Sequence, residues 1–460
     1  MNNPIGRLAR VFHQAGFALH LVGGPVRDRI LGRDPTDLDF TTDARPPEIK
    51  VLLQRAGADT IFNIGERFGT IGAVIGGIPA EITTYRSEVY SGGSRKPEVV
   101  FGSSLEDDLS RRDFTVNAIT QDIATGRIID PVGGLRDIVR RCVRAVGNPD
   151  DRFREDPLRV LRAVRFAAQL NFDIDRDTAA AIRRQATGIG TISAERIGSE
   201  MRLIMLSDRP HRAIVTLRDL GLMSFIIPEL IEMQSTVQDE RHEHKDVFAH
   251  TMRVLAGTPS RIELRWAALL HDVGKPVTKS VRRGRVRFYG HEDVGSRMAR
   301  QILGRLRADN RLTSRVSHIV ALHMRANSYE LSWTDGAVRR FIREAGEELG
   351  NLIALSRADI TSYRPRRVEA GLARVTELHA RCDSIVAEQD VMRLESPLDG
   401  HALMELFNRP PGPWIKPIKR HLLNLVLEGA LDAHDVEGAT RIATELITDE
   451  SGVPTTMLDA

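Results

Sequence analysis

Two periodicities of apolar and polar residues divide this chain. From Leu19 to about Val146, short apolar runs of strand length alternate with turns rich in glycine and proline, whereas helical spacing dominates afterwards. This pattern predicts a head in which a mixed sheet packs with helices, followed by a helical remainder. Within that remainder, the stretch VRRGRVRFYG predicts a hairpin.

The apolar run that ends at Val22 leads into a glycine turn, a short helical stretch and then Asp37 and Asp39. Alternate residues of a strand point to one face, so the two carboxylates can hold divalent cations together. The turn at Gly24 lets backbone N–H groups approach a triphosphate, and Arg27 adds a forked cation. Either fragment alone is more often a solvated loop, but their order favours metal-dependent phosphoryl transfer.

Another segment, REDPLRVLRAVRFAAQL, carries residues that could select the base. Asp156, Arg159 and Arg162 are spaced by three, which predicts that they lie along one side of a helix. Cytosine and adenine both present an amino donor beside a ring-nitrogen acceptor, which a carboxylate and a guanidinium complement. Uracil and guanine reverse the order and leave buried polar groups unpaired, at roughly 1–3 kcal/mol each. The alternative is that these arginines are merely solvated.

A pair of ionisable residues, His271 and Asp272, follows the apolar run Ala-Ala-Leu-Leu in WAALLHDVGKP. Burying such a pair without partners is costly, so we interpret the two as metal ligands. Imidazole and carboxylate together suit several divalent transition metals, and the sequence does not choose among them.

Several of these stretches resemble known families. GGPVRD with DLD is similar to the signature of the nucleotidyltransferase superfamily related to DNA polymerase β. DDLSRRDFTVNAI is similar to template-independent RNA nucleotidyltransferases almost letter for letter. IGERFGTIGAVI, EITTYRSE, DPVGGLRDI and ISAERIGSEM extend the likeness over nearly the whole chain, to bacterial CCA-adding tRNA nucleotidyltransferases with an HD domain.

This resemblance implies an α+β fold in four parts. They are a polymerase β-like head at 1–146, a helical neck at 147–228, an HD domain at 229–364 and a helical C-terminal region at 365–460. It also implies addition of CCA to the tRNA 3′ end from CTP and ATP, with release of pyrophosphate by two-metal in-line transfer.

The resemblance assigns roles to individual positions. It places Mg²⁺ on Asp37 and Asp39 as the catalytic carboxylates, and it implies nucleotide contacts at Gly24, Arg27, Arg112, Asp156, Arg159, Arg162 and Arg165. Glu81, in the strand-like run AEITTY, is either a third carboxylate near the metals or a partner of Arg86.

The HD superfamily supplies the second ligand set. His250 and Asp359 complete a four-ligand pattern with His271 and Asp272, and His291 and His323 fall where two-metal members carry extra ligands. His242 and His244 are further candidates. The metal is a divalent transition metal or Mg²⁺, and the domain either hydrolyses phosphomonoesters or 2′,3′-cyclic phosphates or is a retained scaffold.

Other activities stay open. A poly(A) polymerase shares the head and neck motifs, and an enzyme that adds only CC or only A is a nearer rival. The segment RSEVYSGGSRKPEVVF is of full length, which favours complete CCA addition. From another class, the chain could be an HD metal phosphohydrolase with a nucleotide-sensing head.

Composition agrees with this interpretation but adds little to it. A chain of 460 residues exceeds one ordinary core, and its formal charge of +3 does not by itself indicate nucleic acid. Arginine clusters such as VRRGRVRF, with the basic run around Lys416, Lys419, Arg420 and His421, predict tRNA contacts, unless they are solvated helix faces. Two distant cysteines, no signal-like start and no apolar span predict a soluble, cytoplasmic protein without a membrane partner.

Overall fold

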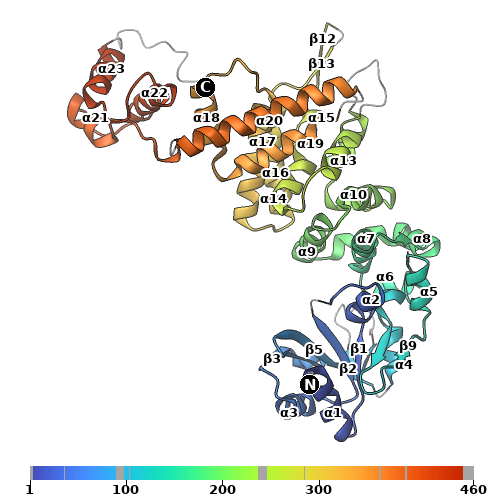
Figure 1. Ribbon diagram of the computed structural model, residues 1–460. Helices are drawn as coiled ribbons and strands as arrows, with labels where there is room; N and C mark the ends of the chain where they lie inside the picture. The colour runs from blue at the N-terminus through green and yellow to red at the C-terminus, as the bar shows by residue number, and fades with distance from the viewer. Residues whose placement is uncertain are drawn as a thin grey trace. The chain divides into compact units, whose positions relative to one another are not determined.

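The computed structural model describes residues 4–35, 37–89, 98–102, 104–236, 246–283, 285–361, 364–388 and 391–448. The chain forms two compact units, Met1–Ile231 and Glu232–Ala460 (Figure 1). The predicted division into four parts stays a prediction, since these units describe only a coarser separation.

The first unit contains a seven-stranded mixed sheet in the order β3-β4-β5-β2-β1-β8-β9. Its strands are β1 (Leu19–Val22), β2 (Leu38–Thr42), β3 (Thr60–Gly65), β4 (Thr70–Ile75), β5 (Ile78–Thr84), β8 (Thr120–Asp122) and β9 (Ile128–Ile129). β2 and β5 run parallel, and the other neighbours are antiparallel. Every residue of β1 is buried, which fits its place near the middle of the sheet.

Helices α1 (Pro4–Gln14) and α3 (Pro46–Ala56) pack on each other and on this sheet. Their apolar stripes are fully buried, including Leu8, Phe12 and Leu53. Shorter elements complete the head: α2 (Gly24–Ile30), β6 (Arg86–Val89), β7 (Glu98–Phe101), α4 (Leu105–Ser110), α5 (Gly134–Val139) and β10 (Cys142–Val143). Residues 90–97 of the segment RSEVYSGGSRKPEVVF lie outside the described residues.

The neck helices are α6 (Pro149–Glu155), α7 (Arg159–Leu170), α8 (Arg176–Gln185), α9 (Ala194–Met205) and α10 (Pro210–Asp219). Side chains of Asn148, Asp175 and Ser193 accept hydrogen bonds from first-turn N–H groups, so ordinary N-caps start α6, α8 and α9. A two-residue strand, β11 (Asp173–Ile174), pairs in parallel with β10 and ties the neck to the head.

The prediction that Asp156 shares a helix with Arg159 and Arg162 is wrong. Asp156 is the extended residue that ends α6, and α7 begins only at Arg159. Pro157 explains the break, because its ring disfavours helical backbone at the residue before it. Spacing by three therefore does not place Asp156 on the face that carries the two arginines.

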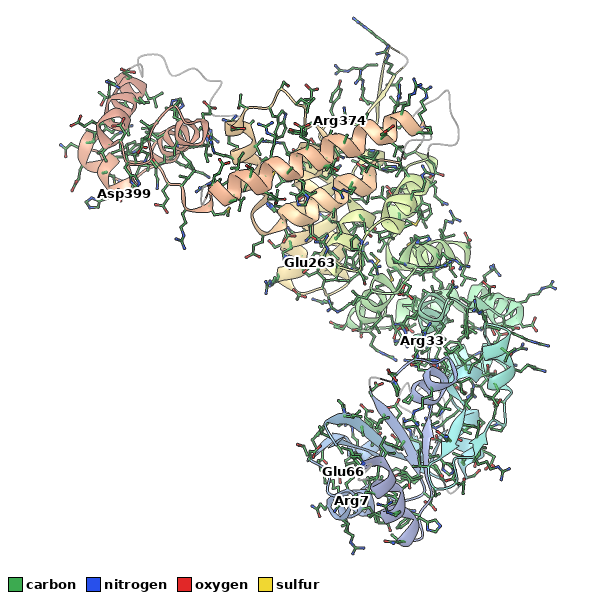
Figure 2. All side chains as sticks on the ribbon, in the orientation of Figure 1. Arg7, Arg33, Glu66, Glu263, Arg374 and Asp399 are labelled. Atoms are coloured by element: carbon green, nitrogen blue, oxygen red, sulfur yellow. The ribbon has the colours of Figure 1, made fainter. Side chains whose placement is uncertain are left out.

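The second unit is helical around a buried α14 (Ile262–Leu270), on which α13 (Val247–Ala256), α17 (Asn310–Asn327) and α19 (Leu349–Asp359) pack. α16 (His291–Arg305) packs along α17. Arg315 of α17 forms ion pairs with Glu263, labelled in Figure 2, and with Glu348. The predicted hairpin is confirmed as β12 (Ser280–Arg282) and β13 (Arg285–Arg287).

The rest of the second unit consists of α15 (Lys275–Thr278), α18 (Asp335–Ala345), the long α20 (Pro365–Glu388), α21 (Gly400–Phe407), α22 (Ile415–Glu428) and α23 (Val436–Thr448). The last three share a small apolar core built around Leu403 and Leu422. Within the described residues, no helix combines the length and apolarity needed to cross a bilayer.

Candidate active site and metal centre

Three carboxylates come together around β2 of the head. Asp37 directly precedes the strand, Asp39 is its second residue, and Glu81 is the register partner of Asp39 on β5. Burial raises the pKa of Asp39 to about 6, and repulsion from Asp37 and Glu81 adds to the rise. Arg112 offsets only part of that repulsion. Carboxylate oxygens are the ligands that a hard divalent cation takes.

The glycine turn before these carboxylates has the geometry that the sequence predicts. Gly23 has φ 77°, a left-handed conformation that favours glycine. A Cβ atom there would lie 3.2 Å from Nη1 of Arg112, so the guanidinium that partly offsets Asp39 lies directly against the turn. Arg27 is buried and donates to Asp28 and, at 2.6 Å, to Oδ1 of Asn117. The cation predicted to touch phosphate is therefore held firmly in place.

Three of the predicted arginines gather around one ring. The guanidinium carbons of Arg27, Arg162 and Arg165 lie 5.4, 5.4 and 4.3 Å from the ring centre of Phe166. Asp113 pairs with Arg162 at 2.7 Å, and Glu200 lies 3.3 Å from Arg165. Burial lowers the pKa of Arg165 and raises that of Glu200. Each of these arginines also has a carboxylate neighbour, so the cluster is a network of ion pairs around Phe166 whose guanidinium groups could also bind a phosphate.

In this structure each of the two predicted base-reading residues is engaged with another side chain of the protein. Oδ2 of Asp156 binds Nη2 of Arg196, on α9, at 2.9 Å. Arg159 is buried and binds Oε2 of Glu155 at 2.8 Å. Among the described residues, no hydrogen bond or ion pair joins Asp156 to Arg159. Sequence reasoning missed Arg196, whose only signal was its place in the matching stretch ISAERIGSEM.

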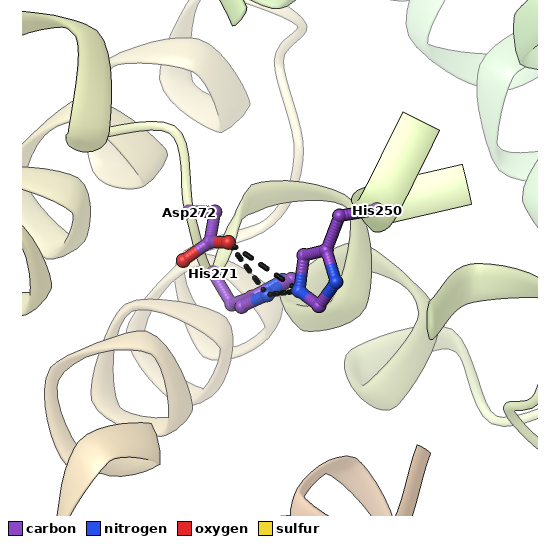
Figure 3. A group of neighbouring side chains, drawn as sticks. All are labelled: His250, His271 and Asp272. Carbon is purple, nitrogen blue, oxygen red and sulfur yellow. Dashed lines mark hydrogen bonds and ion pairs between the residues drawn. The ribbon is translucent and has the colours of Figure 1, made fainter. Parts of the chain in front are cut away.

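The second unit brings the predicted HD ligands together. Nε2 of His250 lies 2.8 Å from Asp359, 3.5 Å from Asp272 and 3.4 Å from Nε2 of His271. Figure 3 shows His250, His271 and Asp272 converging from α13 and from the turn that ends α14. On its other side, Asp272 lies 3.6 Å from Nε2 of His291. Asp272 therefore belongs to two neighbouring groups of possible metal ligands, the second with His291 and His323.

The orientation of the imidazole rings favours a cation at this centre. The Nδ1 atoms of His271, His291 and His323 lie 2.7–2.9 Å from backbone carbonyl oxygens, so each must carry a proton to donate. Nε2 of the neutral ring then carries a lone pair. Yet Nε2 of His291 faces Nε2 of His323 at 3.3 Å, where two lone pairs repel each other. Metal ions at Nε2 relieve this repulsion, and the Nδ1 bonds orient the ligands.

The protonation state of His323 agrees with that function. Burial lowers the pKa of His323 to about 4, so this imidazole is neutral near pH 7, as ligation requires. Burial alone would also lower the pKa of His271, but the charges of Asp272 and Asp359 outweigh burial and raise that pKa, so a metal there must displace a proton. Although burial alone would raise the pKa of Asp272, the charges of His271 and Lys275 hold it well below its usual range. Lys275 binds Asp272 at 2.7 Å and was not predicted. His242 and His244 lie outside the described residues.

Family models match three consecutive regions of the chain. They are described as the poly A polymerase head domain at residues 19–144, the probable RNA and SrmB-binding site of polymerase A at 171–233, and the HD domain at 244–364. The chain is 35% identical over 419 residues to an A-adding tRNA nucleotidyltransferase of Deinococcus radiodurans, covering 87% of this chain and 90% of the relative. The chain belongs to the tRNA nucleotidyltransferase family.

Further similarities support this membership. A CCA-adding enzyme of Geobacillus thermodenitrificans is 30% identical over 428 residues, 92% of each chain. The crystal structure of the Bacillus stearothermophilus CCA-adding enzyme in complex with CTP matches with a TM-score of 0.70 at 27% identity, covering 98% of this chain and 99% of that one. The protein is thus an RNA nucleotidyltransferase, an activity that implies a divalent metal. The region that the head-domain model matches, residues 19–144, includes Asp37, Asp39 and Glu81.

Proposed function

We propose that the protein adds CCA to the 3′ end of tRNA from CTP and ATP, without a nucleic-acid template and with release of pyrophosphate. The placement of Asp39 on β2 beside Glu81 of β5, directly after Asp37, carries the proposal, because carboxylates on neighbouring positions can hold a divalent cation together. Relatives named as CCA-adding enzymes, one of them crystallised with CTP, support the substrates.

The residues of the head have different roles in nucleotide addition. Asp37 and Asp39, with Glu81, hold Mg²⁺, which when bound lowers the pKa of the tRNA 3′-hydroxyl and neutralises the phosphates. Gly24 and Arg112 lie at the turn where the triphosphate approaches, and Arg27, Arg162 and Arg165 supply positive charge. Catalysis is then mostly positioning and charge neutralisation, with no covalent enzyme intermediate.

Base selection requires a rearrangement of the neck. Asp156 must release Arg196 before it can accept from the amino group of cytosine or adenine. Arg159 must likewise turn from Glu155 toward the ring nitrogen. These exchanges replace one charge-assisted hydrogen bond with another, so the correct base compensates for the broken pairs and a wrong base does not.

Addition of A alone is the second candidate, since the relative from Deinococcus radiodurans is named for it. The test gives CTP, ATP and Mg²⁺ to tRNA lacking CCA, to tRNA ending in CC and to an unrelated RNA, and separates the products on a gel. Extension of the first by three residues and of the second by one supports CCA addition. Extension of only the second means A addition, and long tails on all three mean poly(A) synthesis.

The second unit supports an additional activity of its own. The grouping of His250, His271, Asp272 and Asp359, with His291 and His323, suits a metal-dependent phosphohydrolase acting on phosphomonoesters or 2′,3′-cyclic phosphates. A transition metal bound there would activate water. The test is hydrolysis by protein loaded with Mn²⁺, Co²⁺ or Ni²⁺, with His271→Ala as the inactive control. Because tRNA and nucleotides are the substrates, we place the protein in the cytoplasm.

A further inference from the structure

A small cavity opens beside the HD centre. It has a volume of about 180 Å³ and is bounded by α17, α19 and α20. Asp359 is part of its wall, and Oδ1 of this residue faces His250. The cavity is smaller than the roughly 300–1,000 Å³ of pockets for drug-sized ligands, so it suits a terminal group rather than a whole nucleotide.

The wall contributed by α20 carries one cation, Arg374, which Figure 2 labels on that helix. Arg374 is exposed, and within the described part of the chain no hydrogen bond or ion pair occupies its guanidinium. Two other arginines of the second unit have partners: Arg381 binds Asp335 and Tyr329, and Arg315 binds Glu263. A guanidinium without a partner is suited to an anion once a divalent cation bound at Asp359 offsets the negative charge of that carboxylate.

The opposite wall positions the carboxylate. Nδ2 of Asn327 donates to Oδ2 of Asp359 at 2.5 Å, and Oδ1 of Asn327 accepts from Ser356 at 2.6 Å. All three residues line the cavity. This chain of bonds engages Oδ2 of Asp359 while its Oδ1 lies 2.8 Å from His250, so Asp359 is the residue through which the cavity borders the HD ligands.

We infer that Arg374 binds the phosphate group of phosphomonoester substrates of the HD centre and sets its preference for monoesters over phosphodiesters. The inference rests on the proposed phosphohydrolase function. A monoester has three non-bridging oxygens, so a cation bound at Asp359 and the guanidinium fork can each be satisfied. A 2′,3′-cyclic phosphate has only two and gains less from Arg374. Arg374 lies on α20, beyond residues 244–364, where the HD model matches.

The reaction balances without another reactant. The oxygen of water forms a bond to phosphorus, the ester P–O bond breaks, and the leaving alkoxide takes up the proton that the water loses. The products are inorganic phosphate and an alcohol. Arg374 touches the substrate phosphate throughout and stays protonated.

The experiment uses the full chain loaded with Mn²⁺ and compares Arg374→Ala, Arg374→Lys and Arg367→Ala. Arg367 lies seven residues earlier on the same face of α20, is exposed and does not line the cavity. The substrates are p-nitrophenyl phosphate and 2′,3′-cyclic AMP. Calorimetry measures the binding of inorganic phosphate and, separately, of Mn²⁺.

We expect Arg374→Ala to raise KM for p-nitrophenyl phosphate and Kd for inorganic phosphate by about 10- to 100-fold. The KM for the cyclic phosphate changes much less, and Mn²⁺ binding does not change. Arg374→Lys should lose less phosphate affinity than Arg374→Ala, because lysine keeps the positive charge but lacks the forked N–H donors of a guanidinium. Arg367→Ala behaves as the unsubstituted protein does.

Two results overturn the inference, and they differ. If the unsubstituted protein hydrolyses the monoester but Arg374→Ala binds phosphate equally well, or weakens both substrates equally, only the role of Arg374 is wrong. If the unsubstituted protein hydrolyses neither substrate with any metal, the phosphohydrolase proposal fails and the inference fails with it.

Discussion

The head and the second unit each assemble a group of candidate metal ligands, but by opposite electrostatic routes. In the head, Asp39 lies among carboxylates, and burial with mutual repulsion raises its pKa to about 6. In the second unit, burial would raise the pKa of Asp359, but the hydrogen bond from His250 and the charge of His271 lower it. One group is short of positive charge, and the other balances its carboxylates with imidazoles.

This difference predicts which metal ions each site prefers. A group made only of carboxylate oxygens suits Mg²⁺, which keeps several waters and binds through carboxylates and substrate phosphates. Imidazole nitrogens with two carboxylates suit transition metals, for which they have higher affinity. We therefore expect the two sites to prefer different ions.

The idea that the two sites act independently would be contradicted most clearly by one substitution that disables both. Asp37→Ala removes a head carboxylate, and we expect nucleotide addition to fall about a thousandfold or more, since metal-based charge stabilisation contributes several kcal/mol. His271→Ala removes an HD ligand and leaves addition intact. Rates of CTP and ATP incorporation, measured beside phosphatase rates, check both variants.

The control for Asp37→Ala and His271→Ala is the activity that each variant should keep. Phosphatase activity must survive Asp37→Ala, and each variant must keep the far-ultraviolet circular dichroism of the unsubstituted protein. Near-normal addition by Asp37→Ala contradicts the metal assignment in the head.

Metal analysis sharpens the comparison within the second unit. Because Asp272 belongs to both ligand groups, Asp272→Ala should abolish transition-metal binding, whereas His323→Ala should remove about one equivalent. Elemental analysis after dialysis gives the metal content per chain. Loss of all metal in His323→Ala would instead indicate a single site.

The neck offers a test of intermediate size. Asp156→Ala should reduce discrimination of CTP and ATP against UTP and GTP by about 10- to 100-fold, because the amino group loses its acceptor. Triphosphate affinity should change less. The measurement is kcat/KM for each nucleotide, and unchanged selectivity contradicts the pairing model.

Arg196→Ala is the matched variant, since it removes the partner that holds Asp156 in this structure. We expect base selectivity to be kept. A loss of selectivity equal to that of Asp156→Ala would mean that Arg196 itself orients the carboxylate during selection.

The sequence predicted residue identity better than it predicted pairing. Motif spacing predicted Asp39, His271 and Asp272 as metal ligands, a role that stays a prediction, and the structure places each of them near other ionisable side chains. Spacing misplaced Asp156, because Pro157 overrides the helical period, and it missed Arg196, which lies 40 residues away along the chain. Such contacts depend on how helices pack, which periodicity within one segment does not report.

The smallest effect concerns stability and has opposite signs at the two sites. The folded pKa of Asp39 lies above its unfolded value near 3.8, so stability falls as pH rises from about 4 to 6, and the penalty is complete above that. The folded pKa of Asp359 is lowered, so its carboxylate stabilises the protein above its unfolded pKa and loses that contribution at lower pH.

Without metal at pH 7.5, Asp39→Asn should raise the melting temperature by roughly 2–4 °C, and Asp359→Asn should lower it. At pH 4 the gain from Asp39→Asn should largely disappear, because the native carboxyl is then protonated. Calorimetry of chelator-treated protein at both pH values checks these signs, and a destabilised Asp39→Asn at pH 7.5 would show that the repulsion among the head carboxylates is already compensated by protein cations.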